Sequence, residues 1–409
     1  MNAFEILKQR GFIEQMTHET EMIEQLNKPT VFYIGFDPTA DSLHTGHYLA
    51  LMAAAHMQRA GHVPIVLMGG GTGMVGDPDK MDQMRSLMDI SEIDHNVECL
   101  KAQVGRFIDF GEGRAILANN ADWLRELKYA DFIRDYGIHF SVNRMLSRDK
   151  YKNKFEGNGL NFFELNYQVM QAYDFLELNR RFDCVLQVGG SEQWSNIIAG
   201  VELIRRVDAK PAYGMTFTLL LTADGQKMGK TLGGAIWLDA AKTSPYELYQ
   251  HLRNTHDGLV SKYMALLTFL TMEEIESLTT SKDVNINNAK EVLAFEVTKI
   301  VHGEEEAAKA QNAAKALFSG GQAADAPTTQ ITAADLGEGL TLIDLMVLCG
   351  LDKSKSDARR NISQGGVSVD GKKISAEDVG KIITSRDFEN GEILIQKGKK
   401  TFHKVVLGR

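Results

Sequence analysis

The sequence predicts an α/β protein built on a parallel sheet, followed by a helical region and a small α+β region. Two hydrophobic runs, Val31–Phe36 and Val63–Met68, flank a helical segment from Tyr48 to Arg59. A strand, a crossover helix and a second strand in this order form a parallel pair, and ligands bind at the carboxyl ends of such strands. The 409 residues are enough for roughly two to four domains.

The composition is typical of an ordinary globular protein. Hydrophobic residues make up 44% of the chain and charged residues 24%. No apolar run approaches the roughly 18 residues of a membrane span, and the N-terminus lacks a signal-peptide pattern, so we expect a cytoplasmic location. Cys99, Cys184 and Cys349 are scattered, which fits a reducing compartment and predicts neither disulfides nor a cysteine-based metal site.

Charge is distributed unevenly along the chain. The formal net charge is −9, but residues 341–409 hold 13 Lys and Arg against 9 Asp and Glu. A basic surface on a small terminal region is typical of contact with a phosphate backbone, although a surplus of four charges also suits a plain solvated surface.

Further elements can be assigned in chain order. Residues 1–26 have apolar residues at helical spacing and predict an amphipathic helix. Residues 84–110 predict another helix, and residues 115–118 predict a short strand. Residues 123–158 are helical in pattern and interrupt the sheet as an insertion would. We expect this insertion, about residues 123–160, to provide a subunit contact.

Two histidines open the helix that follows the first strand. His44 and His47 are three residues apart and lie on one side of its first turn. A helix N-terminus offers unsatisfied N–H groups and partial positive charge, so it suits a phosphate chain. On these residues alone, a metal pair or idle surface histidines are equally open, since no Glu follows His44 as in a zincin helix.

A glycine-rich turn follows the second strand. Gly71, Gly73 and Gly76 match the G-x-G-x-x-G pattern of a dinucleotide site. Asp77-Pro78 interrupts the path into a helix, because the residue before a proline avoids helical geometry. We therefore expect these glycines to let the backbone approach a ligand closely.

A helix predicted over 163–178 carries three polar residues on one face. Tyr167, Gln171 and Asp174 stand at i, i+4 and i+7. Such a stripe is usually the solvent side of a helix, although apolar neighbours leave little wet surface here. The strand Phe182–Val188 then runs into a turn whose carboxylate could hold a ribose.

A lysine-containing loop spans residues 222–231. Its tail is similar to a P-loop, but only three residues separate Gly225 from Gly229, where a Walker motif needs four, and no helix follows. Lys227 and Lys230 could close over phosphates. A lysine-rich surface turn is the alternative.

The remaining chain predicts a helical region, a linker and a small α+β module. Ser244–Glu247 and Thr271–Glu274 are capping boxes, which indicates helices within residues 244–318. The Gly- and Ala-rich run 319–335 predicts a linker.

The final module, residues 336–409, begins with an apolar helix at 342–348. A basic helix follows at 354–362, and short strands are expected at 366–369 and 393–396.

In combination, these motifs resemble the class I aminoacyl-tRNA synthetases, and most closely the bacterial tyrosyl-tRNA synthetases. His44–His47 is similar to the HIGH signature and Lys227–Thr231 to KMSKS. The match extends over Tyr33–Ala40, Thr72–Pro78, Gln171–Asp174 and Gly189–Trp194, while residues 341–409 resemble an S4-like RNA-binding module. The resemblance implies a Rossmann-like catalytic domain over 1–220, a helical domain over 221–318 and an S4-like domain over 336–409.

The resemblance also implies the reaction. Tyrosine attacks the α-phosphate of ATP, with Mg²⁺ bound to the ATP, to form tyrosyl-adenylate and pyrophosphate, and tyrosine then passes to the terminal adenosine of tRNA(Tyr). The attacking carboxylate is already ionised at pH 7, so catalysis depends on positioning and on charge stabilisation. A homodimer without a protein-bound metal is implied as well.

The resemblance assigns residues to four roles. The implied catalytic residues are Thr39, His44, His47, Lys80, Arg85, Lys227, Lys230 and Thr231. Those implied for tyrosine are Tyr33 and Asp174 at the phenol, and Asp77, Tyr167 and Gln171 at the ammonium. Those implied for ATP are Gly35, Asp37, His44, His47, Gly190, Glu192, Gln193 and Lys230. Those implied for tRNA are Lys353, Lys355, Arg359 and Arg360.

Three alternatives share parts of this pattern. Small-molecule adenylyl and cytidylyl transferases have a similar H-x-G-H site but need no RNA module. Tryptophanyl synthetases share the fold, but Tyr33, Asp174 and the tail favour tyrosine. A non-catalytic RNA-binding relative would not be expected to retain both signatures and the whole pocket.

Overall fold

The computed structural model divides into two compact units, residues 1–307 and 308–409. The residues that it describes are 2–77, 88–157, 159–223, 225, 228, 230–231, 234–280, 285–318, 326–337, 339–388, 391–398 and 401–408.

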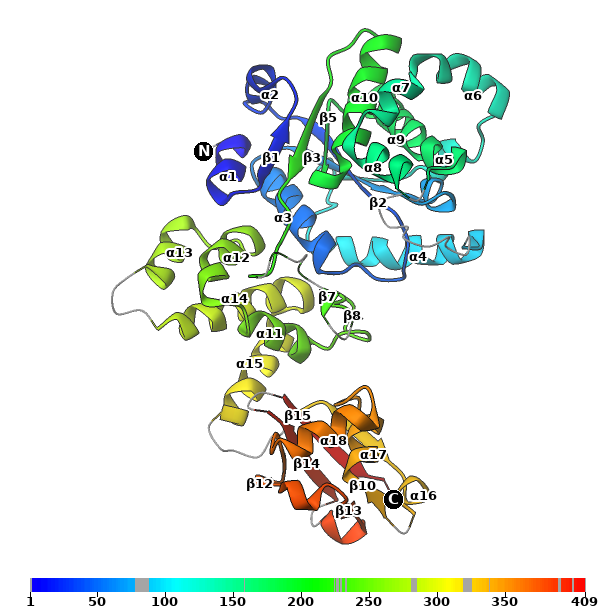
Figure 1. Cartoon of the computed structure of the whole chain (residues 1–409). Helices are drawn as coiled ribbons and strands as arrows, with labels where there is room; N and C mark the ends of the chain where they lie inside the picture. The colour runs from blue at the N-terminus through cyan, green and yellow to red at the C-terminus, as the bar shows by residue number, and fades with distance from the viewer. Residues whose placement is uncertain are drawn as a thin grey trace. The chain divides into compact units, whose positions relative to one another are not determined.

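A six-stranded sheet forms the centre of the first unit (Figure 1). Its strands are β1 Ile13–Met16, β2 Val31–Phe36, β3 Val63–Met68, β4 Ile116–Asn119, β5 Leu186–Gly190 and β6 Tyr213–Phe217, in the order β1-β6-β5-β2-β3-β4. All neighbours are parallel except β1, which is antiparallel to β6. The predicted parallel sheet is thus confirmed.

The chain order reverses between β2 and β5. From β2 the sheet continues through β3 to β4 on one side, and through β5 to β6 on the other. Ligands of open parallel sheets bind at such a reversal, beyond the carboxyl ends of the strands. The turns after β2 and β5 are therefore the expected location of a site.

The prediction of one helix over residues 1–26 was wrong. Helix α1, Ala3–Arg10, ends at Gly11, whose φ of 82° suits a left-handed cap, and α2 covers only Glu19–Gln25. The residues between them form β1. Pairing of this strand with β6 outweighs the local helical spacing of its apolar residues.

Helices cover the sheet. They are α3 Thr45–Arg59, α4 Ile90–Val104, α9 Phe162–Phe182 and α10 Trp194–Val207. Between β4 and α9 lie short helices, α5 Ala121–Leu124, α6 Tyr129–Asp135, α7 Val142–Leu146 and α8 Asp149–Glu156, grouped around α9 and α10 (Figure 1). Buried residues of α9 and α10, such as Phe175 and Leu203, pack with Ile65 and Leu67 of β3 in one core. Within the described residues, no helix is long and apolar enough to cross a membrane.

A group of helices completes the first unit. It contains α11 Pro245–Arg253, α12 Val260–Leu267, α13 Met272–Thr279 and α14 Ile286–His302, and α15 Glu304–Phe318 follows. Both predicted capping boxes are present: Ser244 pairs with Glu247 and Thr271 with Glu274.

The second unit is a small α+β fold. Its main sheet contains β9 Thr328–Ile331, β11 Val367–Val369, β12 Lys372–Lys373, β14 Glu392–Lys397 and β15 Thr401–Leu407, in the order β12-β11-β14-β15-β9. Helices α17 Leu342–Leu348 and α18 Lys355–Ser363 contribute Leu345 and Ile362 to its core.

Strand β9 differs from the expected linker over 319–335. It pairs in parallel with β15, and Ile331 is buried in the core. The β-branched residues Thr328 and Thr329 suit a strand, but the Gly- and Ala-rich stretch before them obscured that signal.

Candidate active site

A polar network lies at the carboxyl ends of the central strands. Asp37 follows β2, Thr72 lies in the turn after β3, and Asn120 follows β4. The Thr72 hydroxyl donates to Asp37 Oδ1 over 2.8 Å, and Asn120 Nδ2 donates to Thr72 Oγ1 over 2.9 Å. Three segments far apart in the sequence are thereby joined at one sheet edge.

Asp174, on α9, is the buried end of this network. Its Oδ2 accepts from Asn120 Nδ2 at 2.9 Å, and its Oδ1 accepts from Trp123 Nε1 at 2.7 Å. Burial raises the pKa of Asp174 to about 8, although these two hydrogen bonds lower it. The side chain is only 2% exposed, so the polar face of α9 is not a solvent face here.

Tyr33, on β2, presents a hydroxyl without a partner. The residue is 1% exposed, and its Oη has no hydrogen-bond partner among the described residues. Burial raises the pKa of Tyr33 well above its ordinary value, and the charge of Asp174 adds to this effect. A buried hydroxyl normally finds a partner, so this one is available to a ligand.

Tyr167 contacts the same network from the first half of α9. Its hydroxyl donates to Asp37 Oδ2 over 2.6 Å. Burial, followed by the charges of Asp37 and Asp77, raises the pKa of Tyr167 well above its ordinary value, so the phenol remains a proton donor. Two carboxylates thus lie near this hydroxyl and create a negative environment.

A second chain of hydrogen bonds connects Asp77 with α9. Gln193 Nε2 donates to Asp77 Oδ2 over 2.9 Å, while Asn196 Nδ2 donates to Gln193 Oε1 over 3.1 Å. Asn196 Nδ2 also donates to Gln171 Oε1 over 2.9 Å. Asn196 receives a hydrogen bond from the Tyr151 hydroxyl, which orients its amide group.

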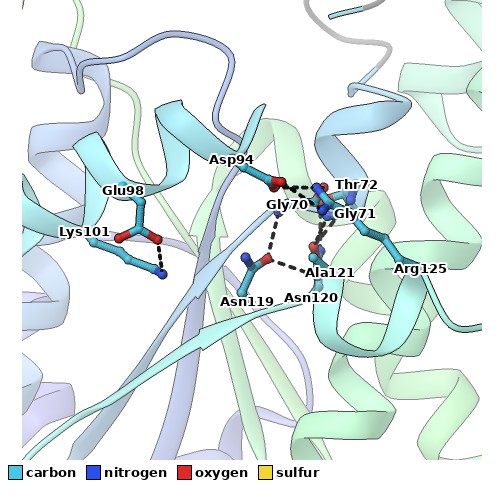
Figure 2. A network of polar contacts seen from close by, with 10 residues as sticks. All are labelled: Gly70, Gly71, Thr72, Asp94, Glu98, Lys101, Asn119, Asn120, Ala121 and Arg125. Atoms are coloured by element: carbon cyan, nitrogen blue, oxygen red, sulfur yellow. Dashed lines mark hydrogen bonds and ion pairs between the residues drawn. The ribbon is translucent and has the colours of Figure 1, made fainter. Parts of the chain in front are cut away.

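The glycine turn after β3 is packed against protein atoms. Figure 2 shows Asn119 and Asn120 accepting from the backbone N–H groups of Gly70 and Gly71, at 3.2 and 2.7 Å. A Cβ on Gly71 would lie 2.8 Å from the Cβ of Leu124, so a side chain does not fit there. At Gly71 the close approach is thus to Leu124 and Asn120 of the protein itself.

Arg125 links the glycine turn to α4. It donates to the carbonyl of Gly70 over 2.9 Å and forms an ion pair of 2.7 Å with Asp94 of α4 (Figure 2).

His44 and His47 stack at the start of α3. Their ring centroids are 3.9 Å apart with planes 21° from parallel. The N–H of Gly46 donates to His44 Nδ1 over 3.0 Å, and the N–H of His44 donates to His47 Nδ1 over 3.2 Å. Because each Nδ1 accepts, a neutral ring carries its proton on Nε2, which suits donation to a phosphate or hydroxyl oxygen.

The segment after the lysine loop pairs with this histidine turn. Trp237 forms an antiparallel bridge with His44, and the backbone of Leu43–Thr45 exchanges hydrogen bonds with Ile236 and Leu238, at 3.0 and 2.8 Å. The histidine turn is thus adjacent to residues 236–238, which follow the lysine loop and lie about 190 residues away in the chain.

Several expected residues lie at the same strand ends. Gly35 is the penultimate residue of β2, and the N–H of Thr39 donates to the carbonyl of Asp37 over 2.8 Å. Gly190 ends β5 and Glu192 follows it; Glu192 Oε2 has no hydrogen-bond partner among the described residues.

Of the four expected cationic residues, the structure describes only the backbone of Lys230. Lys230 and Thr231 make up the short strand β7, which pairs with β8, Gly234–Ala235. Lys80, Arg85 and Lys227 lie outside the described residues.

The four residues expected at tRNA are exposed in the second unit. Lys353 precedes α18, which carries Lys355, Arg359 and Arg360. Lys355 forms an ion pair of 2.6 Å with Asp344, so its charge is partly compensated.

Sequence reasoning missed Asn120, Trp123, Thr72 and Asn196. Asn120 had a readable signal, because it follows a predicted strand of the parallel sheet and so must lie at the site edge. Trp123 and Asn196 lie on helices and reach the site only through packing, which no local pattern discloses.

Comparison with known proteins agrees with this geometry. The family described as "tRNA synthetases class I (W and Y)" matches residues 24–319, and a tyrosine–tRNA ligase C-terminal domain family matches residues 320–405. The chain therefore belongs to the class I tRNA synthetases of the tryptophan and tyrosine group. Within that family it is of the bacterial tyrosyl type, since full-length relatives of this type match it from end to end.

Those relatives are named tyrosine–tRNA ligase. The protein from Acetivibrio thermocellus is 55% identical over 408 residues, which is 99% of each chain. The one from Clostridium botulinum is 53% identical over 410 residues, and that from Lachnoclostridium phytofermentans is 54% identical over 405.

Solved structures give the same result. The mitochondrial tyrosyl-tRNA synthetase of Aspergillus nidulans is 30% identical with a TM-score of 0.69, covering 78% of this chain and 94% of its own. A tryptophanyl-tRNA synthetase from Encephalitozoon cuniculi, 12% identical with a TM-score of 0.57, shares the fold.

Proposed function

We propose that this chain activates L-tyrosine with ATP and transfers it to tRNA(Tyr). In the first step a carboxylate oxygen of tyrosine forms a bond to the α-phosphorus of ATP, and the bond to pyrophosphate breaks. In the second step a ribose hydroxyl of the tRNA attacks the adenylate carbonyl, and AMP leaves. The observation that carries the choice of tyrosine is the Tyr33 hydroxyl beside buried Asp174, because this hydroxyl has no hydrogen-bond partner in the part of the chain that the structure describes.

Tyr33 and Asp174 would recognise the phenol. The substrate hydroxyl would donate to the Asp174 carboxylate and accept from the Tyr33 hydroxyl. Asn120 and Trp123 already donate to Asp174 and hold its carboxylate in place. Phenylalanine would leave both buried groups without this partner, and that cost favours tyrosine.

Tyr167, Gln171 and Asp77 would receive the substrate ammonium. The supporting observation is a negative environment: Asp37 and Asp77 both act on the Tyr167 hydroxyl. A cation there would offset the two carboxylates, and Gln171 Oε1 is an additional acceptor.

His44, His47 and Thr39 would face the phosphates and ribose at the start of α3. The Nε2–H tautomer imposed on both rings and the helix N-terminus all offer donors to anionic oxygen. We propose that Lys230 and Thr231 act with them, together with Lys80, Arg85 and Lys227. Mg²⁺ would enter with the ATP phosphates.

Glu192 would accept from the ATP ribose, supported by its Oε2, for which the described residues provide no hydrogen-bond partner. A Cβ on Gly190 would lie 2.5 Å from the Glu192 carboxylate, so the glycine leaves room for that side chain. Gly35, Asp37 and Gln193 complete the proposed ATP site at the ends of β2 and β5.

We also propose a cytoplasmic homodimer with a catalytic domain over 1–220, a helical domain over 221–318 and an S4-like domain over 336–409. Exposed hydrophobic residues between β4 and α9 and in the first turn of α9 support a subunit contact there: Tyr129, Ile133, Ile138, Val142, Phe155, Phe162 and Phe163. A monomer in sedimentation velocity at micromolar concentration would contradict the dimer.

Tyrosine-dependent exchange of pyrophosphate into ATP tests the activity. Purified protein with Mg²⁺ should exchange label only when L-tyrosine is present, and Asp174→Ala should abolish exchange while the protein stays folded. An absence of exchange in the wild-type protein would refute the proposed function. Near-normal exchange by the variant would remove Asp174 from the site.

A further inference from the structure

We propose that Trp237 is a positioning residue for the His44 imidazole during tyrosine activation. This rests on the proposed function, in which His44 contacts the ATP phosphates. Trp237 contacts the His44 ring edge-to-face and is not among the residues proposed to touch ATP. Its contribution would be to fix the ring that does.

Trp237 belongs to a row of four rings. Its ring centroid is 6.0 Å from that of His44 in an edge-to-face arrangement, and His44 stacks on His47 at 3.9 Å. His47 in turn lies edge-to-face with Phe36 of β2 at 5.8 Å. Phe36, in the sheet, is one end of this series of ring contacts, and Trp237 is the other end.

The His44 ring is also restrained by its own helix turn. Its Nδ1 accepts from Gly46 N–H, which fixes one edge. A Cβ on Gly46 would lie 2.7 Å from His44 Cε1, so the ring lies directly against this glycine and requires it there. The indole of Trp237 adds an edge-to-face contact to these restraints.

Three contacts restrain Trp237 itself. Its backbone N–H donates to Thr243 Oγ1 over 3.0 Å, and its backbone is bridged to His44. Lys242 Nζ lies 5.4 Å from the indole centroid and forms an ion pair of 2.8 Å with Asp41. Asp41 lies just before the histidine turn, so this ion pair links the segment that carries Trp237 to the segment that carries His44.

Positioning of this kind matters when charge develops on the departing pyrophosphate. A donor that is displaced by a fraction of an ångström loses much of its transition-state stabilisation. Tyrosine contacts Tyr33 and Asp174 in the proposed site, so its affinity should not depend on Trp237. Loss of the indole should therefore slow the chemical step and leave tyrosine binding unchanged.

A double-mutant cycle tests this in the full-length protein. The rate of tyrosyl-adenylate formation is measured by chemical quench with α-labelled ATP, and tyrosine affinity by equilibrium dialysis. Trp237→Leu should slow the step about tenfold while tyrosine affinity changes by less than about twofold. Trp237→Phe should recover most of the rate, because a ring is restored. In a His44→Ala background, Trp237→Leu should have no further effect.

Three outcomes would overturn the proposal: an unchanged rate for Trp237→Leu, equal slowing in both His44 backgrounds, or loss of tyrosine binding. If Trp237→Leu fails to fold, Trp237→Phe decides in its place, with a small rate loss that must vanish in His44→Ala. Absence of adenylate formation in the wild-type protein would instead refute the proposed function.

Discussion

Burial raises the pKa of Asp174 so that its charge changes near neutral pH, although two N–H donors oppose this shift. Its folded-state pKa is about 8, well above the ordinary value of 3.8. The folded protein therefore binds more protons here than the unfolded chain between these two values. Stability from this group is fully present below about pH 4 and is lost as the pH rises to about 8.

Asp174→Asn removes this dependence. Without tyrosine, the variant should gain stability relative to wild type as the pH rises from 5.5 to 8, with a slope of up to about 1.4 kcal/mol per pH unit. The difference in melting temperature between the two proteins, measured by differential scanning fluorimetry across this range, checks it. A difference that does not vary with pH would contradict a raised pKa.

At the residue scale, the sequence predicted the groups that a family motif carries. Tyr33, Tyr167 and Asp174 do lie together with Asp37 at one sheet edge. It did not predict Trp123, whose indole reaches Asp174 only because α5 packs against the turn after β3. A single side-chain contact across a helix and a strand leaves no periodic trace in the sequence.

At the element scale, α1 holds the C-terminal end of α12. Arg10 donates to the carbonyls of Ala265, Thr268 and Leu270, at 2.9, 3.2 and 2.5 Å. A helix C-terminus has unsatisfied carbonyls and partial negative charge, so a guanidinium suits it. This contact ties the N-terminal helix to the helical group of the first unit.

Arg10→Ala should lower the free energy of unfolding by about 1 to 3 kcal/mol, because it leaves half-buried carbonyls without a donor. Urea unfolding measures this loss. Charging of tRNA should fall more than pyrophosphate exchange does, since the contact helps to position the helical group. Gln9→Ala, at an exposed neighbouring position, is the matched control. Equal effects of the two variants would exclude a role for the clamp.

Element boundaries show where sequence patterns suffice. Strands β2 and β3 matched their predicted ranges, because continuous apolar runs bounded by Asp37-Pro38 and Gly69 mark buried parallel strands. Strands β1 and β9 were missed. Each lies at the edge of its sheet, where only one neighbour and one core face constrain its sequence.

At the scale of the whole molecule, the two proposed tasks fall in different units of the chain. The proposed chemistry lies in the first unit, and the exposed basic residues around α18 lie in the second. Strand β9 belongs to the second unit's sheet, so a clean deletion must begin before it. Truncation after Phe318 leaves that sheet out entirely.

The truncated protein should keep tyrosine-dependent pyrophosphate exchange and lose most tRNA charging. The physical reason is loss of phosphate contacts, which carry much of the affinity for nucleic acid.

In the full-length protein, removing Lys353, Arg359 and Arg360 together should weaken tRNA binding and reduce its salt dependence by roughly one unit of slope per lost contact. Filter binding from low to high salt measures both, with exposed Lys28→Ala of the first unit as control. An unchanged slope would assign tRNA binding to other residues, and unchanged charging after truncation would exclude the second unit from it.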